Sequence, residues 1–391
     1  MTAFEQIKEN DLNYILHTYG RVDIALVRGR NARVWDDAGK EYIDFTSGIG
    51  VNSLGYCDPQ WVEAVAKQAG VIQHLSNYYH SPRNIELAED LARAGGMARA
   101  FFCNSGAEAN ECAVKVARKA GGKESGHKFK IITLINSFHG RTLTTLAATG
   151  QEVFHKKFLP LTEGFAYAWA GDLAGLEELI DDETCGVMLE CVQGEGGVIP
   201  MEDEYLKGVR ELCDKKGISM IVDEVQTGIG RTGTFFAYQS AGIVPDIVTC
   251  AKGLGGGLPI GVCMVSDKLK EVFEPGDNGS TFGGNPVVCA GAREVVRRVS
   301  APDFLDEVIK KGEYIREKLE KLPQVEFIRG KGLMLGVKLK PGCAGAHDIM
   351  LQCAEKGLLI LTAKDLVRFL PPLTIPMTDI DEGLSIFEAV I

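Results

Sequence analysis

Two patterns of hydrophobic and polar positions alternate along the chain. Short apolar runs predict buried strands, and between them apolar residues recur at the spacing of a helix that buries one face. Strands that alternate with helices predict βαβ units around a mostly parallel sheet. The predicted strands are Ala100–Cys103, Lys130–Leu134, Cys185–Leu189, Ser219–Val222, Ile247–Cys250 and Gly261–Val265. Two predicted helices are Ala107–Ala120 and Glu204–Lys216.

The pattern changes at both ends of the chain. Near the amino end, ARVWDDAGKEYIDF predicts an antiparallel hairpin that turns at Asp37–Gly39. The carboxyl end predicts a long helix from Pro286 and a charged helix around Asp306–Leu322. Strands near Gly332–Leu339 and Val367–Leu370 follow them.

We therefore expect two domains in an α/β chain. Residues 46–285 would form a large domain around the central sheet. Residues 1–45 and 286–391 would together form a smaller α+β domain, with the helix from Pro286 as the connection. A chain of 391 residues suits two or three domains at about 150 residues each.

Composition and charge argue against several classes of function. Hydrophobic residues make up 45% of the chain and charged residues 24%, as in ordinary globular proteins. The net charge of −11 argues against a nucleic-acid partner and gives no attraction to an anionic membrane. The first residues, MTAFEQIKEN, lack the features of a signal peptide, and no apolar run reaches the ~18 residues of a membrane span.

Cysteine and histidine spacing gives no sign of a metal site. The 11 cysteines are scattered without a Cys-x-x-Cys pair, which indicates free thiols in a reducing cytoplasm. The seven histidines show no His-Glu-x-x-His pattern, so we expect no bound metal.

Ligands of parallel sheets bind beyond the carboxyl ends of the strands, so the residues after each strand are informative. The strand Ala100–Cys103 is followed by NSGAEANE, in which Ser105 can cap a helix and Glu108 completes a capping box. Gly106 and Ala107 leave the first turn free of bulk, so its N–H groups could bind an anion. The same residues could equally form a well-capped helix that binds nothing.

Two further strands end in charged residues. Asp223 follows Ser219–Val222, with Gln226 shortly after it, and could either pair with a cation or cap a loop. Lys252 follows Ile247–Cys250 and could react as a buried amine or extend to solvent. The glycines of KGLGGG favour the first reading, because they would let a bulky ligand approach the backbone.

Together, the three strand ends provide an anion-binding helix N-terminus, a carboxylate and an amine. Pyridoxal 5′-phosphate needs all three: a helix N-terminus for its phosphate, an acid for its ring nitrogen and a lysine for its aldehyde. The segment GIGRTG, Gly228–Gly233, literally matches a dinucleotide fingerprint. However, DEVQT separates it from its strand, and Asp246 begins the next strand rather than ending it, so a nicotinamide cofactor is disfavoured.

Six blocks in order resemble the class III, ornithine/acetylornithine-type, pyridoxal-phosphate aminotransferases of fold type I. They are FFCNSGAEANECAVKVARK, SFHGRT, QGEGGVIP, DEVQTGIGRTG, AKGLGGGLPIG and STFGGNP, and the resemblance covers nearly the whole chain. It implies an α/β fold of type I, with a mostly parallel central sheet in the large domain and a smaller α+β domain built from both termini.

The resemblance implies a role for each matching residue at the cofactor. Lys252 matches the lysine that forms a Schiff base, and Asp223 matches the partner of the pyridine nitrogen. The remaining matches are Gln226 near the ring hydroxyl, Phe138 stacked on the ring, Ser105, Gly106 and Ala107 at the phosphate, and Thr281 as a phosphate ligand supplied across a homodimer interface.

It also implies a set of substrate-binding residues. Arg141 matches the arginine that holds the donor's α-carboxylate. Arg368 matches a second arginine that pairs with Glu195 and is released when glutamate binds. Ser280 and Tyr19 complete the expected substrate site. Each of the two arginines could instead serve a purely structural role.

The expected activity is transfer of the δ-amino group of N-acetylornithine to 2-oxoglutarate by ping-pong kinetics, as in arginine biosynthesis. N-succinylornithine, ornithine and 4-aminobutyrate remain alternative donors. Ile49 stands where ornithine aminotransferases typically carry a tyrosine, which favours an acylated donor. A family member that has lost catalysis and serves as a binding or regulatory protein is the alternative of a different class.

Overall fold

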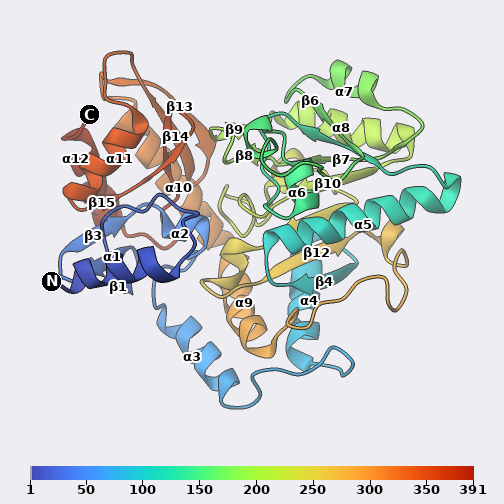
Figure 1. Cartoon of the computed structure of the whole chain (residues 1–391), viewed down its shortest axis with the longest axis horizontal. Coiled ribbons are helices and arrows are strands. Elements are labelled where there is room, and N and C mark those ends of the chain that lie inside the picture. Colours follow the sequence, from blue (N-terminus) through green and yellow to red (C-terminus); the bar gives the residue numbers. More distant parts are fainter. Residues whose placement is uncertain (1) are drawn as a thin grey trace.

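A seven-stranded sheet forms the centre of the molecule (Figure 1). The structure is a computed structural model that describes residues 2–391, apart from the side chains of residues 123–125. In spatial order the strands are β4 (Arg99–Cys103), β12 (Gly261–Val265), β11 (Ile247–Cys250), β10 (Ser219–Asp223), β7 (Thr184–Leu189), β5 (Lys130–Leu134) and β6 (Phe165–Ala168).

The sheet is parallel except at β12. This strand pairs antiparallel with both of its neighbours, β11 and β4, whereas β11, β10, β7, β5 and β6 run in one direction. All six predicted strands are confirmed to within one residue at each end. The seventh strand, β6, was not predicted; it is a short strand at the edge of the sheet and is only partly buried. The predicted mostly parallel α/β fold is confirmed.

Helices cover both faces of this sheet, which explains why its central strands are apolar on both sides. On one face, α5 (Gly106–Ser125) packs small side chains against the sheet, namely Ala109, Cys112, Ala113, Val116 and Ala117, at helical spacing. On the other face, α8 (Asp203–Lys216) packs Leu206, Val209 and Leu212 against Met220 and Val222 of β10. The remaining helices of this part are α3 (Pro59–Ala69), α4 (Pro82–Gly95), α6 (Leu143–Ala148), α7 (Leu173–Leu179) and α9 (Pro286–Val299).

Two four-stranded sheets are built from the terminal parts of the chain, the first from both ends and the second from the carboxyl end alone (Figure 1). The first contains β1 (Leu26–Arg30), β2 (Arg33–Asp36), β3 (Glu41–Asp44) and β15 (Leu358–Leu359). The second contains β13 (Val325–Lys331), β14 (Met334–Leu339), β17 (Leu366–Phe369) and β16 (Leu361–Ala363). β15 pairs parallel with β3, so residues from opposite ends of the sequence share one sheet. A two-stranded sheet is formed by β8 (Val192–Gln193) and β9 (Ile199–Pro200).

The helices and strands predicted near the two ends of the chain are present, although some begin or end at other residues than predicted. β2 and β3 form the predicted hairpin, in which Gly39 adopts a φ of 87°. The charged helix α10 covers Pro302–Leu319 and begins earlier than predicted, because Pro302 suits the first turn of a helix. The other terminal helices are α1 (Ala3–Tyr14), α2 (Ser47–Gly50), α11 (Ala346–Glu355) and α12 (Met377–Glu388). Within residues 2–391, no helix combines the length and apolar character needed to cross a bilayer.

Candidate active site

Lys252 lies directly beyond the carboxyl end of β11. It begins the short 3-10 helix η3 (Lys252–Gly255) and has a left-handed backbone with φ 40°. Burial lowers the pKa of Lys252, an effect that the carboxylate of Glu195 partly offsets. A lowered pKa increases the fraction of neutral amine, which is the nucleophilic and basic form.

The glycines after Lys252 mainly permit close packing within the protein, which corrects the expectation that they make room for a ligand. A Cβ on Gly253 would lie 2.5 Å from Ser53 Oγ, and a Cβ on Gly256 would lie 2.8 Å from Trp61 Nε1. Of these glycines, Gly257 is the one that lines the cavity described below.

Asp223, the last residue of β10, is held in a network of buried polar groups. Its Oδ2 accepts a hydrogen bond from Asn110 Nδ2 at 2.8 Å and lies 2.8 Å from His139 Nδ1. Its Oδ1 accepts from the N–H of Val225 at 2.9 Å. Burial lowers the pKa of His139, but the hydrogen bond to Asp223 and the charge of Asp223 outweigh it, so the pKa is raised overall. Asp223 thus both caps a loop and pairs with a side chain that can carry positive charge.

The amino end of α5 forms the predicted cap with one difference. Ser105 Oγ accepts from the N–H of Glu108 at 3.2 Å, as a capping serine does. The Glu108 carboxylate, however, accepts from the N–H of Asn104 at 3.0 Å rather than from that of Ser105. The first N–H groups of a helix have no acceptor within the helix. The turn that contains Gly106 and Ala107 can therefore donate to an anion.

These strand ends meet at one cavity of about 440 Å³. It lies between the carboxyl edge of the sheet and the loops that follow β5 and β11. Eight of the predicted residues line it: Ser105, Gly106, Ala107, Phe138, Arg141, Asp223, Gln226 and Lys252. The structure thus brings together the three strand ends from which a pyridoxal-phosphate site was predicted.

Arg368 and Glu195 form the expected ion pair beside this cavity. Arg368 Nη1 donates to Glu195 Oε1 at 2.6 Å and to Gln226 Oε1 at 3.2 Å. The Arg368 side chain is 3% exposed and that of Glu195 is 31% exposed. Burial raises the pKa of Glu195, but the charge of Arg368 and its hydrogen bond, together with the charge of Lys252 and a hydrogen bond from Gln226, lower the pKa overall. Arg368 Nε is buried and has no hydrogen-bond partner among residues 2–391, so this guanidinium retains a free donor.

Besides Arg368 and Glu195, three predicted residues lie outside the cavity lining. Ser280 Oγ accepts from Asn104 Nδ2 at 3.3 Å and so lies next to the amino end of α5. Thr281, the next residue, is exposed. Tyr19 is also exposed, and its ring lies 5.5 Å from the guanidinium of Arg21.

Sequence reasoning missed three buried polar residues that line the cavity, namely His139, Asn110 and Glu190. Glu190 accepts hydrogen bonds from the N–H groups of Phe138 at 3.1 Å and Gly194 at 3.4 Å. Burial raises the pKa of Glu190 to about 7. It follows β7 directly, so the rule that identified Asp223 could have found it. His139 and Asn110 carry no such local signal.

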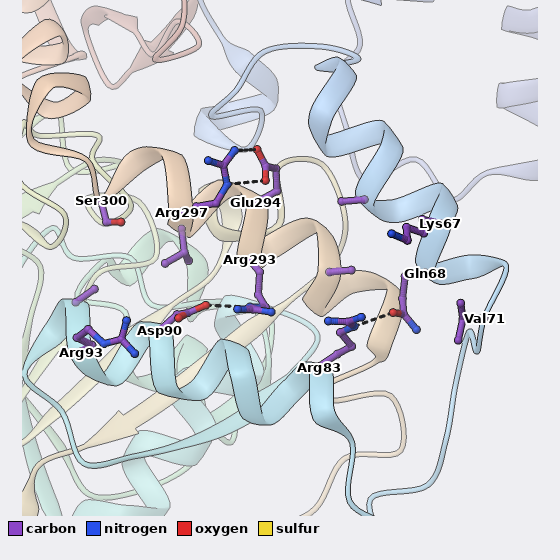
Figure 2. Close-up of a pocket in the computed structure, with 14 residues that line it drawn as sticks. Lys67, Gln68, Val71, Arg83, Asp90, Arg93, Arg293, Glu294, Arg297 and Ser300 are labelled. Atoms are coloured by element: carbon purple, nitrogen blue, oxygen red, sulfur yellow. Dashed lines mark hydrogen bonds and ion pairs between the residues drawn. The ribbon is translucent and has the colours of Figure 1, made fainter.

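A second cavity, of about 710 Å³, lies between α3, α4 and α9 (Figure 2). Its arginines are matched by neighbouring carboxylates. Arg293 Nε donates to Asp90 at 2.9 Å, and both Arg297 Nε and Nη2 donate to Glu294, as the dashed lines in Figure 2 show. None of the predicted cofactor or substrate residues lines it, so the candidate active site is the smaller cavity.

Comparison with known proteins agrees with this geometry. The family model for class-III aminotransferases matches residues 14–391. The chain belongs to the class-III aminotransferases. Their substrates are small amino and keto acids, and the cofactor of this class-III aminotransferase is pyridoxal 5′-phosphate.

Relatives of this class-III aminotransferase match it along nearly their whole length. The chain is 49% identical to the acetylornithine aminotransferase of Haemophilus ducreyi over 99% of this chain and 98% of that protein. It is 50% identical to the acetylornithine aminotransferase of Caldanaerobacter subterraneus subsp. tengcongensis over 97% of each. Among solved structures, the ornithine aminotransferase of Toxoplasma gondii superposes with a TM-score of 0.94 at 32% identity, over 100% of this chain and 95% of that one. N-acetylornithine aminotransferase from Stenotrophomonas maltophilia gives a TM-score of 0.84 at 38% identity, over 98% of each.

The residues of this class-III aminotransferase fit the cofactor on structural grounds. A Cβ on Gly106 would lie 2.7 Å from Val225 Cγ1, so the first turn of α5 stays bare at the cavity wall. The buried Asp223 carboxylate opens onto the same cavity as the amine of Lys252. Phe138 supplies an aromatic ring at its wall, as a flat ligand requires.

Proposed function

We propose that this enzyme transfers the δ-amino group of N-acetylornithine to 2-oxoglutarate, giving N-acetylglutamate 5-semialdehyde and glutamate. The single observation that carries the chemistry is the convergence of Lys252, Asp223 and the amino end of α5 on one cavity. Relatives at 49% and 50% identity that are named acetylornithine aminotransferases support the choice of donor.

When bound, pyridoxal 5′-phosphate supplies a carbonyl that condenses with amines and a protonated ring that accepts electrons from the carbon losing its proton. Lys252 would hold the cofactor, and its Nζ, once displaced by the donor amine, would take the proton from the donor's δ-carbon and pass it to the cofactor, which keeps the amino group. The Asp223 carboxylate keeps the proton on the ring nitrogen, with His139 and Asn110 fixing its orientation. Ser105, Gly106 and Ala107 would bind the phosphate, Phe138 would stack on the ring, and Gln226 would contact the ring hydroxyl.

Two arginines let one cavity accept two substrates. Arg141 binds the α-carboxylate of N-acetylornithine as a planar, bidentate partner. Arg368 remains paired with Glu195 during this half-reaction, so that it offers no free charge to the donor. When 2-oxoglutarate or glutamate binds, the pair opens and Arg368 takes the α-carboxylate. Ser280 and Tyr19 lie near the substrate in this scheme.

We propose further that the active unit is a homodimer in which Thr281 of each chain binds the phosphate held by the other. Thr281 is exposed, and large apolar side chains are exposed around it, including Phe282 at 60% and Tyr78 at 96%. Asn77 Nδ2 donates to the carbonyls of Ser280 and Gly283, so these segments adjoin. Exposed apolar patches of this kind are typical of interfaces. All eleven cysteines are free, which supports a reducing compartment such as the cytoplasm.

Purified protein tests both the cofactor and the donor. Lys252→Ala should lose the visible absorbance of the bound cofactor and all turnover, whereas Lys310→Ala, on the exposed face of α10, should retain both. Continued amino transfer by Lys252→Ala would refute the assignment. Initial rates with N-acetylornithine, N-succinylornithine, ornithine and 4-aminobutyrate identify the donor. A larger kcat/KM for one of the last three would replace N-acetylornithine, and no transfer from any of them would favour a binding or regulatory role.

A further inference from the structure

Arg141 is held by aromatic rings rather than by carboxylates. Its guanidinium carbon lies 4.1 Å from the centroid of the Phe154 ring and 5.3 Å from that of Phe138. Within residues 2–391, this side chain forms no hydrogen bond or ion pair; it is exposed and lines the cavity. Its N–H groups are therefore available to a ligand.

Phe154 lies behind Arg141 and outside the cavity lining. It ends the short 3-10 helix η1 (Glu152–Phe154), and the next residue, His155, is fixed by a 2.7 Å contact between its Nε2 and the carbonyl of Thr149. The Phe154 ring also meets Phe138 edge to face, with centroids 6.1 Å apart and planes at 82°. One ring thus contacts both the arginine and the aromatic side chain that faces the cofactor site.

The contact suits an arginine that must stay charged and unpaired. A ring attracts a cation through its electron-rich face but offers no hydrogen-bond acceptor to the fork of N–H groups. A carboxylate in the same place would occupy that fork and compete with the substrate. An aromatic support restricts the side chain, which reduces the entropy lost when a substrate carboxylate binds, and leaves all the donors free.

We propose that Phe154 is a positioning residue that determines specificity for amino donors with a carboxylate distal to the reacting amine. It holds the Arg141 guanidinium over its ring face at the cavity wall, ready for bidentate binding of the carboxylate. This inference rests on the proposed function of Arg141. It concerns a residue that touches neither cofactor nor substrate.

The alternative is that Phe154 only fills space beneath the loop. The two roles differ in what a change of side chain does to different substrates. Phe154→Leu and Phe154→Met remove the ring while keeping an apolar side chain of moderate size, and Phe154→Tyr keeps the ring. A pair of donors isolates the carboxylate: N-acetylputrescine is N-acetylornithine without its carboxylate, so it has nothing for Arg141 to bind.

Steady-state kinetics of the holoenzyme should separate these cases. For N-acetylornithine, both ring-free variants should raise KM and lower kcat/KM by about 2- to 30-fold, the range of a cation–π contact. Their kcat/KM for N-acetylputrescine should stay within about twofold of the wild type, and Phe154→Tyr should behave as wild type with both donors. Thermal midpoints and bound-cofactor absorbance should remain those of the wild type.

A double-mutant cycle completes the test. In an Arg141→Met background, Phe154→Leu should cause no further loss with N-acetylornithine. An unchanged N-acetylornithine reaction in both ring-free variants, an equal loss with both donors, or a full additional loss in the Arg141→Met background would each overturn the proposal. If the wild type itself does not use N-acetylornithine, the proposed function fails instead, and the two failures are distinguishable.

Discussion

Replacing Glu195 with glutamine tests whether the Arg368–Glu195 pair acts as a gate. The amide has the size of the carboxylate, and its oxygen can still accept from Arg368 Nη1, which now lies 2.6 Å from Glu195 Oε1. The change therefore removes a charge without opening a hole. Arg368 would keep two neutral acceptors, the new amide and Gln226.

The magnitude follows from the kind of hydrogen bond that is lost. A hydrogen bond that involves a charged group contributes about 1.5–3 kcal/mol. Arg368 stays charged in the variant, so its contact with the neutral amide should fall from the upper end of this range towards the lower end. The substitution should therefore weaken the resting contact by about 1–1.5 kcal/mol. Because glutamate must break this contact to reach Arg368, its apparent affinity should rise about 5- to 12-fold. The freed guanidinium should at the same time attract the donor's carboxylate to the wrong end of the cavity and lower kcat/KM for the donor.

Stopped-flow absorbance can follow each half-reaction of the holoenzyme separately. We expect Glu195→Gln to raise kcat/KM for glutamate and 2-oxoglutarate and to lower it for N-acetylornithine. Glu195→Asp, which keeps the charge on a shorter side chain, is the control and should not favour glutamate. If Glu195→Gln slowed both half-reactions alike, the pair would be a structural contact rather than a gate.

Two further predictions concern a buried residue next to Asp223 and a glycine that lines the cavity. Glu224 is fully buried, and burial raises its pKa to about 7. The folded protein therefore holds this proton more tightly than the unfolded chain, and the free energy of unfolding should fall by about 3 kcal/mol as pH rises from 4 to 8. In urea titrations at several pH values, Glu224→Gln should abolish this part of the pH dependence. An unaltered slope in the variant would contradict the raised pKa. Gly106→Ala would place a methyl group 2.7 Å from Val225 Cγ1. Such overpacking at the cavity wall costs about 1–3 kcal/mol. A fluorescence titration of the cofactor-free protein should therefore show cofactor binding weakened about 5- to 150-fold. A second change, Val225→Ala, should restore most of that affinity, and failure to do so would place the cost elsewhere.

Strand ends were the part of the site that sequence could predict. Ser105, Asp223 and Lys252 each follow an apolar run within two residues, and parallel strands bring their carboxyl ends to one edge. Glu190 obeys the same rule and could have been found. His139 and Asn110 could not, because they reach Asp223 across 84 and 113 residues of sequence from a loop and from within a helix.

Residues contributed by other parts of the chain depended on family resemblance. Arg368 lies on β17, in a different sheet from Asp223, and no local pattern connects it with Glu195. Sequence also could not show what the glycines after Lys252 contact. Only the fold reveals that Ser53 and Trp61 occupy the space beside two of them. The domain division at residues 45 and 285, the homodimer, and the roles of Thr281 and Tyr19 stay predictions.

The pairing of β3 with β15 has a consequence for biosynthesis. The strand that completes this sheet leaves the ribosome roughly 300 residues after its partner, which at about 5–20 residues per second is a delay of about 15–60 s. During that interval the edge of β3 lacks its neighbour while the central sheet can already assemble. A nascent chain that stalls before Leu358 would therefore present an open strand edge and become a target for chaperones or for aggregation.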